Sequence, residues 1–437
     1  MPSQRIPFHR RQSRWPLAAT LLLALAGLSV LGLLVGRWLY ESDIRVRIRV
    51  DEWWGQVREA IAPHPEVLPT AVPVVAAPTS RPASPTPTAS PTTSPSPTPG
   101  PTTTPTPVPP TPTPLPAQVL LEGVKHHYQL FNNCGPTSLA MNMSFWGWAG
   151  DQRDIAGVVK PNDYDRNVSP REMYEYLLTQ GYDAYIRVNG DLDTLRGFIA
   201  AGYPVLIEKG LTCLPGETRC NGWFGHYSVI TGYDDARQVF ITQDSFRGPN
   251  LKISYADLEQ NWRSFNFVYL VVFPAGAEKD AQVVKLLGEA ADVDADYRVA
   301  LERAQQEAQT LTGEAAAFAW FNVGTNLVYF KDYGGAAQAF DEDRQVGLPY
   351  RMLWYQFGPY VSYYSLSRYQ DVIDLATFAI NGAIGEPGLE EAYYWRGLAE
   401  QALGQRSEAV EDFRTALVRH PGYQLAIEAL AALGETP

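Results

Sequence analysis

A proline-rich tract divides the chain into parts that cannot share one core. Residues 81–116 contain 15 prolines among 36 residues, and most of the others are Thr, Ser and Ala. Such a composition has little apolar surface to bury and favours extended polyproline II structure at about 3.1 Å per residue, a reach of roughly 110 Å. We therefore expect a Pro/Thr/Ser-rich linker over residues 63–118, either a disordered spacer or a glycosylated stalk.

The segment before the linker contains a candidate membrane anchor. Residues 16–36 form a run of 21 residues without a charge, and about 20 apolar residues span the hydrocarbon core of a bilayer. Arg37 and Trp38 follow in place of a small-residue cleavage site, so we expect an uncleaved transmembrane helix. Arginines flank this helix in equal number on its two sides, so they do not decide its orientation. The linker and the cysteines favour an extracellular location for the bulk of the chain. We therefore expect a cytoplasmic tail at 1–15, with the juxtamembrane segment 37–62 and all that follows it outside the cell.

Length and charge narrow the remaining options. A chain of 437 residues is longer than one hydrophobic core usually serves, so two or three domains are expected. The formal charge of −12 provides no basic surface for a phosphate backbone. We do not expect a nucleic acid partner.

A globular unit with mixed helix and strand signals is predicted after the linker, over residues 119–275. β-Branched and aromatic runs such as YPVLIEKG, HYSVITGY and FVYLVVFP predict strands. Cys134 directly precedes Gly-Pro and good helix formers, which places it at a helix N-terminus beginning near Pro136. Free N–H groups and the helix dipole there favour the thiolate, so Cys134 is a candidate nucleophile. The alternative is a buried, inert thiol.

A thiolate nucleophile needs a base, and His226 is the best placed of the six histidines. It lies in GHYSVITGYDDARQVFITQDS, which predicts a β-hairpin with a loop at Asp234 to Ala236. This register places His226 opposite Asp244, whose carboxylate would orient the imidazole, whereas a one-residue slip would place Asp244 opposite Tyr227. The alternatives are a structural strand histidine and an aspartate that only caps a turn.

These residues together resemble a known family. The shared marks are a Gln five residues before the Cys, a Gly-His-Tyr before a strand and an Asp after the next strand: Gln129, Asn132-Asn133-Cys134-Gly135-Pro136, Gly225-His226-Tyr227 and Gln243-Asp244-Ser245. From Gly123 to Pro274 the chain resembles papain-like cysteine peptidases of the double-glycine leader, or bacteriocin-processing, type, in particular their stand-alone members. The resemblance implies an α+β papain-like fold for this unit.

The resemblance also implies a role for each residue. Cys134 attacks a peptide carbonyl, His226 takes and returns the proton, and Asp244 holds the imidazole tautomer. The amide of Gln129, with the backbone N–H of Cys134, stabilises the oxyanion. The Gln-to-Cys spacing here is five, where many papain-like enzymes have six, and the alternative for Gln129 is a surface strand residue.

The other two cysteines suggest a disulfide, and the adjacent histidines do not suggest a metal site. Cys213 and Cys220 bracket a short polar loop before His226, and we expect a disulfide between them, which would leave Cys134 as the odd thiol. His126 and His127 have no further ligands at zinc-site spacing, so we expect them to be solvated or to face the substrate, and we expect no metal and no cofactor.

The chain from residue 276 to 437 predicts an all-α solenoid. Three segments, 320–340, 354–376 and 392–413, share a Gly or aromatic residue in one helix, a turn and a second helix. Gly324 and Gly358 lie 34 residues apart, the tetratricopeptide period, so we expect three tetratricopeptide-like hairpins and a tail helix after His420.

Two classes of function follow from these features. The first is a membrane-anchored extracellular cysteine peptidase that hydrolyses peptide bonds and whose repeats dock a peptide or protein substrate or partner. The second is a catalytically silent peptidase-like binding module with a repeat scaffold for envelope protein assembly. Retention of Cys134, His226, Asp244 and Gln129 favours the enzyme, and acyl transfer to an amine would use the same residues.

Overall fold

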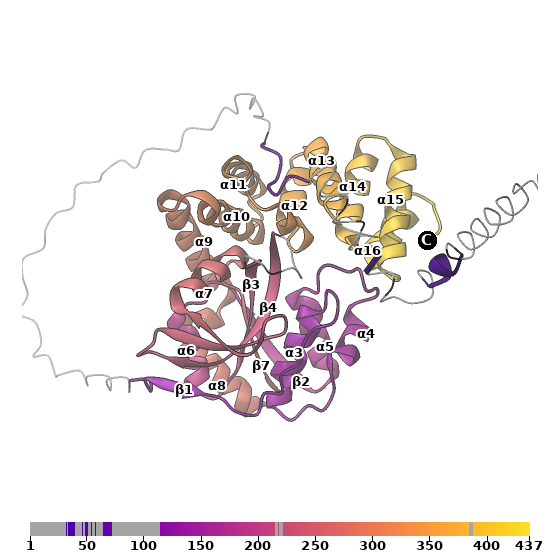
Figure 1. Ribbon diagram of the computed structural model, residues 1–437. Coiled ribbons are helices and arrows are strands. Elements are labelled where there is room, and N and C mark those ends of the chain that lie inside the picture. The colour runs from indigo at the N-terminus through magenta and orange to yellow at the C-terminus, as the bar shows by residue number, and fades with distance from the viewer. Residues whose placement is uncertain are drawn as a thin grey trace, which may run out of the picture. The chain divides into compact units, whose positions relative to one another are not determined.

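The chain is described here from a computed structural model. The described residues are 64–71, 114–214, 217, 222–383 and 388–437, with a few positions between 32 and 57. Two compact units make up the chain, residues 1–65 with 381–387 and residues 66–380 with 388–437. The second unit contains an α+β part and a helical part (Figure 1). Most of the predicted anchor at 16–36 and the linker from 72 to 113 lie outside the described residues.

The α+β part is built on one antiparallel sheet. Its strand order is β2-β7-β3-β4-β5-β6, and β1 pairs with β4 beside this path. The strands are β1 (Gln118–Leu120), β2 (Tyr182–Arg187), β3 (Val205–Thr212), β4 (Trp223–Asp234), β5 (Val239–Asp244), β6 (Gly248–Ser254) and β7 (Tyr269–Pro274).

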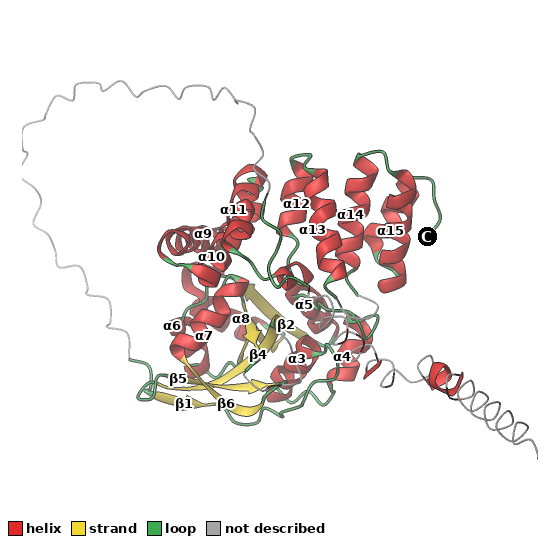
Figure 2. Ribbon diagram, turned by 45° about the horizontal axis from the view of Figure 1, so that its top comes forward, coloured by secondary structure: helices red, strands yellow, loops and turns green. Residues whose placement is uncertain are grey.

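Helices cover both faces of this sheet (Figures 1 and 2). Those on one face are α3 (Cys134–Phe145), α4 (Gln152–Val159) and α5 (Pro170–Thr179). Those on the other are α6 (Leu192–Ala200), α7 (Tyr255–Trp262) and α8 (Ala277–Leu287). Because side chains alternate along a strand, Leu206 packs with the first group of helices and its neighbour Ile207 packs with the second.

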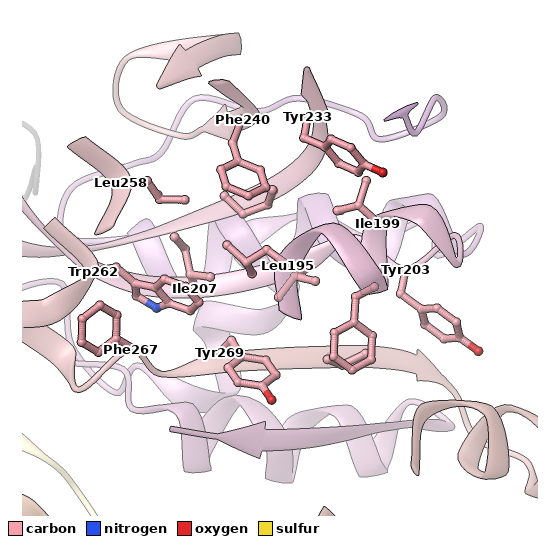
Figure 3. Packing of buried hydrophobic residues seen from close by; sticks show 14 of the residues in the cluster. Leu195, Ile199, Tyr203, Ile207, Tyr233, Phe240, Leu258, Trp262, Phe267 and Tyr269 are labelled. Atoms are coloured by element: carbon pink, nitrogen blue, oxygen red, sulfur yellow. The ribbon is translucent and has the colours of Figure 1, made fainter. Parts of the chain in front are cut away.

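The larger of the two cores lies on the α6–α7 face, and half of its buried side chains are aromatic. Figure 3 shows Trp262 and Tyr269 meeting Leu195 and Ile207, with Phe240 further along the sheet. All five side chains are almost fully buried. This core fixes β3, β5 and β7 rigidly behind the opposite face, where α3 lies.

The helical part begins after η2 (Gly288–Ala291) and consists of packed antiparallel helices. They are α9 (Val293–Thr310), α10 (Gly313–Tyr329), α11 (Tyr333–Val346), η3 (Tyr350–Trp354), α12 (Gly358–Ser365), α13 (Tyr369–Asn381), α14 (Glu390–Ala402), α15 (Arg406–Arg419) and α16 (Gln424–Ala432). The predicted pairs at 320–340, 354–376 and 392–413 correspond to α10/α11, α12/α13 and α14/α15, and α16 is the predicted tail helix.

A glycine–phenylalanine contact recurs inside two of the hairpins. A Cβ added to Gly324 would lie 2.4 Å from the Phe340 ring, and one added to Gly397 would lie 2.8 Å from the Phe413 ring. Because each glycine has no side chain, the phenylalanine ring of the partner helix packs directly against its backbone. Gly324 lies within α10 whereas Gly358 begins α12, so the 34-residue spacing read from the sequence joins positions that are not equivalent.

The predicted linker 63–118 is partly packed. Leu68 and Ala71 are buried, and Pro116 and Ala117 hydrogen-bond to the end of β4. The sequence pattern does not reveal this, because Val67 and Leu68 are only two apolar residues between prolines.

Candidate active site

The turn before α3 is held by one buried amide. The Gln152 side-chain oxygen accepts hydrogen bonds from the Leu130 N–H (2.8 Å), the Asn133 amide (2.7 Å) and the Thr137 hydroxyl (2.8 Å). Its nitrogen donates to the Tyr128 carbonyl (2.9 Å). Gln152 therefore fixes the turn that presents the N-terminus of α3, a role that local sequence patterns do not reveal.

Cys134 is the first residue of α3 and is partly exposed, as predicted for a helix N-terminus. Burial opposes ionisation of its thiol, but the contact with His226, the charge of that imidazole and the backbone N–H groups of Tyr227 and Gly135 outweigh it. The pKa of Cys134 is lowered as a result. Favouring the thiolate in this way gives a nucleophile.

His226 and Asp244 are adjacent, although the predicted register is wrong. Asp244 pairs with Ser228, because the hairpin loop runs from Asp235 to Gln238 and β4 has a bulge at Thr231. His226 lies two residues from Ser228 and therefore on the same face of the sheet. Its Nε2 remains 3.1 Å from Asp244 Oδ1, and both side chains are buried.

Asp244 receives several further contacts. Its Oδ1 accepts the N–H groups of Phe246 (2.9 Å) and Arg247 (2.8 Å), and its Oδ2 accepts the Ser228 hydroxyl (3.2 Å). Lys209 Nζ lies 4.0 Å from Oδ2. The turn-capping and imidazole-orienting readings of Asp244 are thus compatible, because one carboxylate makes both sets of contacts.

The pKa shifts of Cys134, His226 and Asp244 favour an ion pair between the Cys134 thiolate and the His226 imidazolium. Burial would raise the pKa of Asp244, but His226, Lys209 and the Arg247 N–H hold it well below its usual range. Burial would lower the pKa of His226, yet Asp244 and Cys134 raise it above the ordinary value, against a smaller opposing effect of Lys209. A lowered thiol pKa beside a raised imidazole pKa favours thiolate and imidazolium together.

Gln129 lies beside this group on the chain segment before α3. Its backbone N–H donates to the Ser245 carbonyl (2.9 Å), and its side-chain oxygen accepts the Ser245 hydroxyl (2.8 Å). Because this hydrogen bond fixes Oε1 of Gln129, the N–H groups of the same side-chain amide remain available as hydrogen-bond donors. Next to it, His126 Nε2 donates to the Asp244 carbonyl (3.0 Å), so His126 is a structural contact of the site and not the solvated or substrate-facing residue its sequence context suggested.

A buried carboxyl group lies near Cys134. Glu208 pairs with Tyr227 across β3 and β4, and burial, reinforced by the charge of Cys134, raises its pKa well above the ordinary value despite a hydrogen bond with Tyr227. A neutral Glu208 does not repel the thiolate. Neither Glu208 nor Lys209 has a motif around it, so sequence reasoning missed both.

The helical part also reaches the site. A Cβ on Gly225, the residue before His226, would lie 3.0 Å from the Tyr355 ring. The pKa of Tyr355 is raised by burial and then by the charge of Cys134. On the other side, Arg166 Nη1 donates to Asn132 Oδ1 (3.3 Å), and its guanidinium lies 5.3 Å from the Trp354 ring centroid. Residues of η3 and its C-terminus therefore support both the Cys134 turn and the His226 strand.

Comparison with protein families identifies the α+β part. Residues 121–270 match the family described as "Peptidase_C39 like family". This part of the chain is a C39-like peptidase domain. The resemblance inferred from Gln129, Cys134, His226 and Asp244 is thereby confirmed at the level of the domain.

Solved structures give more distant likenesses. Xylellain, a cysteine protease from Xylella fastidiosa, is 14% identical with a TM-score of 0.29 over 37% of this chain and 88% of that chain. A double glycine motif protease from an AMS/PCAT transporter, in complex with the leader peptide, is 14% identical with a TM-score of 0.26 over 36% and 99%. MamA protein is 20% identical with a TM-score of 0.25 over 36% and 79%. At these identities and scores the likenesses carry no argument about function, and a comparison with curated proteins found no match.

Three expectations fall partly or wholly outside the described residues. Cys220 lies outside them, so the Cys213–Cys220 disulfide stays a prediction. Among the helices described, none has the length and apolar character needed to cross a bilayer. Within the same part of the chain, no three His, Cys, Asp or Glu side chains are grouped so as to hold a metal ion.

Proposed function

We propose that the C39-like domain is an active cysteine peptidase with a papain-like catalytic group. Cys134 is the nucleophile, His226 the proton carrier and Asp244 the residue that orients the imidazole. One observation carries the proposal: the thiol contacts an imidazole that lies 3.1 Å from a buried carboxylate, with the thiol pKa lowered and the imidazole pKa raised. Because Nε2 faces Asp244, the other ring nitrogen, Nδ1, serves Cys134.

The reaction follows from these positions. The Cys134 thiolate attacks the scissile carbonyl carbon, and a C–S bond forms as the carbonyl becomes an oxyanion. His226 donates its Nδ1 proton to the amide nitrogen, the C–N bond breaks and the amine leaves. Neutral His226 then takes a proton from water, whose oxygen attacks the thioester; the C–S bond breaks and the acid and the thiolate–imidazolium pair are released.

Gln129 is proposed as the side-chain donor to the oxyanion. Its fixed Oε1 directs the amide nitrogen away from Ser245, and the Cys134 N–H at the start of α3 is the second donor. Loss of one such donor costs a factor of about 10²–10³ in kcat. Gln129→Ala is therefore expected to lower kcat by that factor and to leave the alkylation pKa of Cys134 unchanged.

We also propose that the enzyme is anchored by residues 16–36, with the N-terminus in the cytoplasm and the peptidase outside the cell. The 21 uncharged residues of that segment support the proposal. The tetratricopeptide-like hairpins are proposed to dock the peptide or protein substrate or a partner. A reporter fused after Pro437 that is active only in the cytoplasm would contradict this topology.

Peptide cleavage tests the proposal directly. The full chain in detergent is incubated with a peptide library, and new termini are identified by mass spectrometry, with Cys134→Ala as the matched control. Cleavage by the wild type and not by Cys134→Ala is expected, and ¹⁸O from labelled water should enter the new carboxyl group. Products that carry an added amine instead would indicate acyl transfer, and a chain that binds peptides without cleaving them would support the silent binding module.

A further inference from the structure

A short segment from before the proline-rich tract is bound to the helical part. Residues 66–71 run antiparallel to the turn that follows α11, with a bridge between Val67 and Pro349. The Leu68 N–H donates to the Leu348 carbonyl (2.9 Å), and the Tyr350 N–H donates to the Glu66 carbonyl (3.1 Å). The Leu68 side chain is 3% exposed, whereas its neighbour Val67 is 45% exposed.

The turn after α11 presents its backbone groups to residues 66–71. Helix α11 ends at Gly347, whose φ of +108° lies in the left-handed region that favours glycine. The Leu348 N–H closes back on the Asp343 carbonyl (3.2 Å), so that the Leu348 carbonyl points out to the segment. Extended peptides bind sheet edges by the same backbone pairing, with alternate side chains entering pockets.

A buried arginine binds the next two carbonyl groups. Arg344 Nε donates to the Pro69 carbonyl (2.8 Å), and Nη2 lies 3.5 Å from the Thr70 carbonyl. The guanidinium is held from behind by Asp371, 3.3 Å from Nη1. Pro69 has no N–H to continue the pairing, but its carbonyl still accepts, so the proline suits the point where backbone pairing gives way to arginine.

The residues on both sides of the segment 72–113, which contains most of the proline-rich tract, are therefore attached to the same folded unit. Ala71, just before residues 72–113, is buried, and the Thr70 carbonyl before it lies 3.5 Å from Arg344 Nη2. Just after them, the Pro116 carbonyl accepts the Tyr233 hydroxyl at the end of β4 (2.7 Å). While residues 66–71 are bound, the tract does not add its length to the distance between the N-terminus and the peptidase.

We infer that residues 66–71 are a built-in ligand of the helical part. The binding surface, formed by Arg344 and the turn Leu348–Tyr350, takes an extended segment with a buried leucine followed by proline. The occupant is the chain's own segment. Its release would lengthen the tether of the peptidase by the whole proline-rich tract, so the contact sets how far from its N-terminal attachment the enzyme acts. The binding of residues 66–71 does not depend on the proposed catalysis, whereas its effect on reach rests on the proposed N-terminal anchor.

Cutting the tract tests whether the contact holds on its own. A specific protease site is inserted after Gly100 in the full chain, which is tagged at the N-terminus and purified in detergent. After cleavage, the C-terminal fragment is expected to stay on the affinity resin through residues 66–71. Leu68→Asp should release it and Val67→Asp should not. Release of the wild-type fragment, or equal retention by the two variants, would overturn the inference.

Competition by a peptide provides a second readout. The synthetic peptide HPEVLPTAVP, residues 64–73, is added to the cleaved wild-type protein on the resin. It should displace the C-terminal fragment, whereas the same peptide with Asp in place of Leu68 should bind about tenfold to a hundredfold more weakly. Equal displacement by the two peptides would show that burial of the Leu68 side chain does not select the segment.

Discussion

The α+β part and the helical part differ in the kind of side chain that they bury at the contacts compared below, around Cys134 and inside the hairpins. Around Cys134 the α+β part buries ionisable and polar groups, among them Glu208, Lys209, His226 and Asp244. Inside two hairpins the helical part packs a glycine against an aromatic ring, as in the contact of Gly324 with Phe340, beside ion pairs such as that of Arg396 with Asp412. Charge changes around Cys134 should therefore act through pKa values, and through the pH dependence of stability that follows from them, whereas filling a glycine contact in a hairpin should lower stability without moving those pKa values.

Removing the charge of Asp244 should have the largest effect. Asp244→Asn keeps an oxygen that can accept the Phe246 and Arg247 N–H groups but loses the charge that raises the pKa of His226. We expect turnover to fall about tenfold to a hundredfold, and the alkaline limit of activity to move to lower pH. Ser228→Ala, which removes one hydrogen bond to Oδ2, is the control that should keep that limit. An alkaline limit of activity that is the same in Asp244→Asn and in the wild type would contradict the role given to charge in the α+β part.

Filling a hairpin contact should cost stability alone. Gly324→Ala places a methyl group within 2.4 Å of the Phe340 ring, and the overpacking should exceed the gain in helix propensity, for a net loss of about 1–2 kcal/mol in the free energy of unfolding. Gly157→Ala is the control, because Gly157 is an exposed position of α4 with open space around it. That change should stabilise by about 0.5–1 kcal/mol. Denaturant unfolding measures both, and a shift in the Cys134 alkylation pKa of Gly324→Ala would contradict the division of roles.

Lys209 should act through the pKa of His226. Its positive charge lowers the pKa of His226, so Lys209→Met should move the alkaline limit of activity to higher pH. The replacement is of similar length, and Asp244 keeps its other hydrogen bonds. A pH–rate profile measures the shift. Lys209→Arg should retain the wild-type limit, and a downward shift in Lys209→Met would argue against this effect.

Glu208 should give the smallest effect, one confined to the pH dependence of stability. Its folded-state pKa is raised, so the folded chain retains a proton that the unfolded chain has lost, and stability falls as pH rises from the unfolded pKa towards the folded one. Glu208→Gln removes this loss. Unfolding midpoints at pH 5 and pH 8 should lie closer together in Glu208→Gln than in the wild type, and an unchanged difference would contradict a protonated Glu208.

The same two regions differ in how far sequence could predict them. Cys134, His226 and Asp244 were predicted from local motifs, and the structure places them together. His226 and Asp244 are in contact despite the wrong register, because a shift of two residues keeps a side chain on the same face. The bulge at Thr231 was not predicted, although Gly232 directly after it is a strand glycine of the kind that often marks a bulge. Gln152 was missed because its contacts join residues far apart in the chain.

In the helical part the helix pairs were predictable and their contacts were not. Apolar and small residues at helical spacing indicate hairpins, but the partner of each face depends on packing. Tyr355 approaches Gly225 from another part of the chain, and the docked Leu68 belongs to a pair of apolar residues, Val67 and Leu68, between prolines. Neither has a periodic pattern that reasoning from sequence could use.

The alkylation rate of Cys134 by iodoacetamide as a function of pH tests the central claim most directly. The full chain is compared with His226→Ala, and Cys134→Ala gives the background. The thiolate–imidazolium pair predicts an apparent thiol pKa well below about 8.5 in the wild type and a return towards that value in His226→Ala. An unshifted pKa in the wild type, or a lowered one that His226→Ala leaves in place, would contradict the catalytic role of the pair.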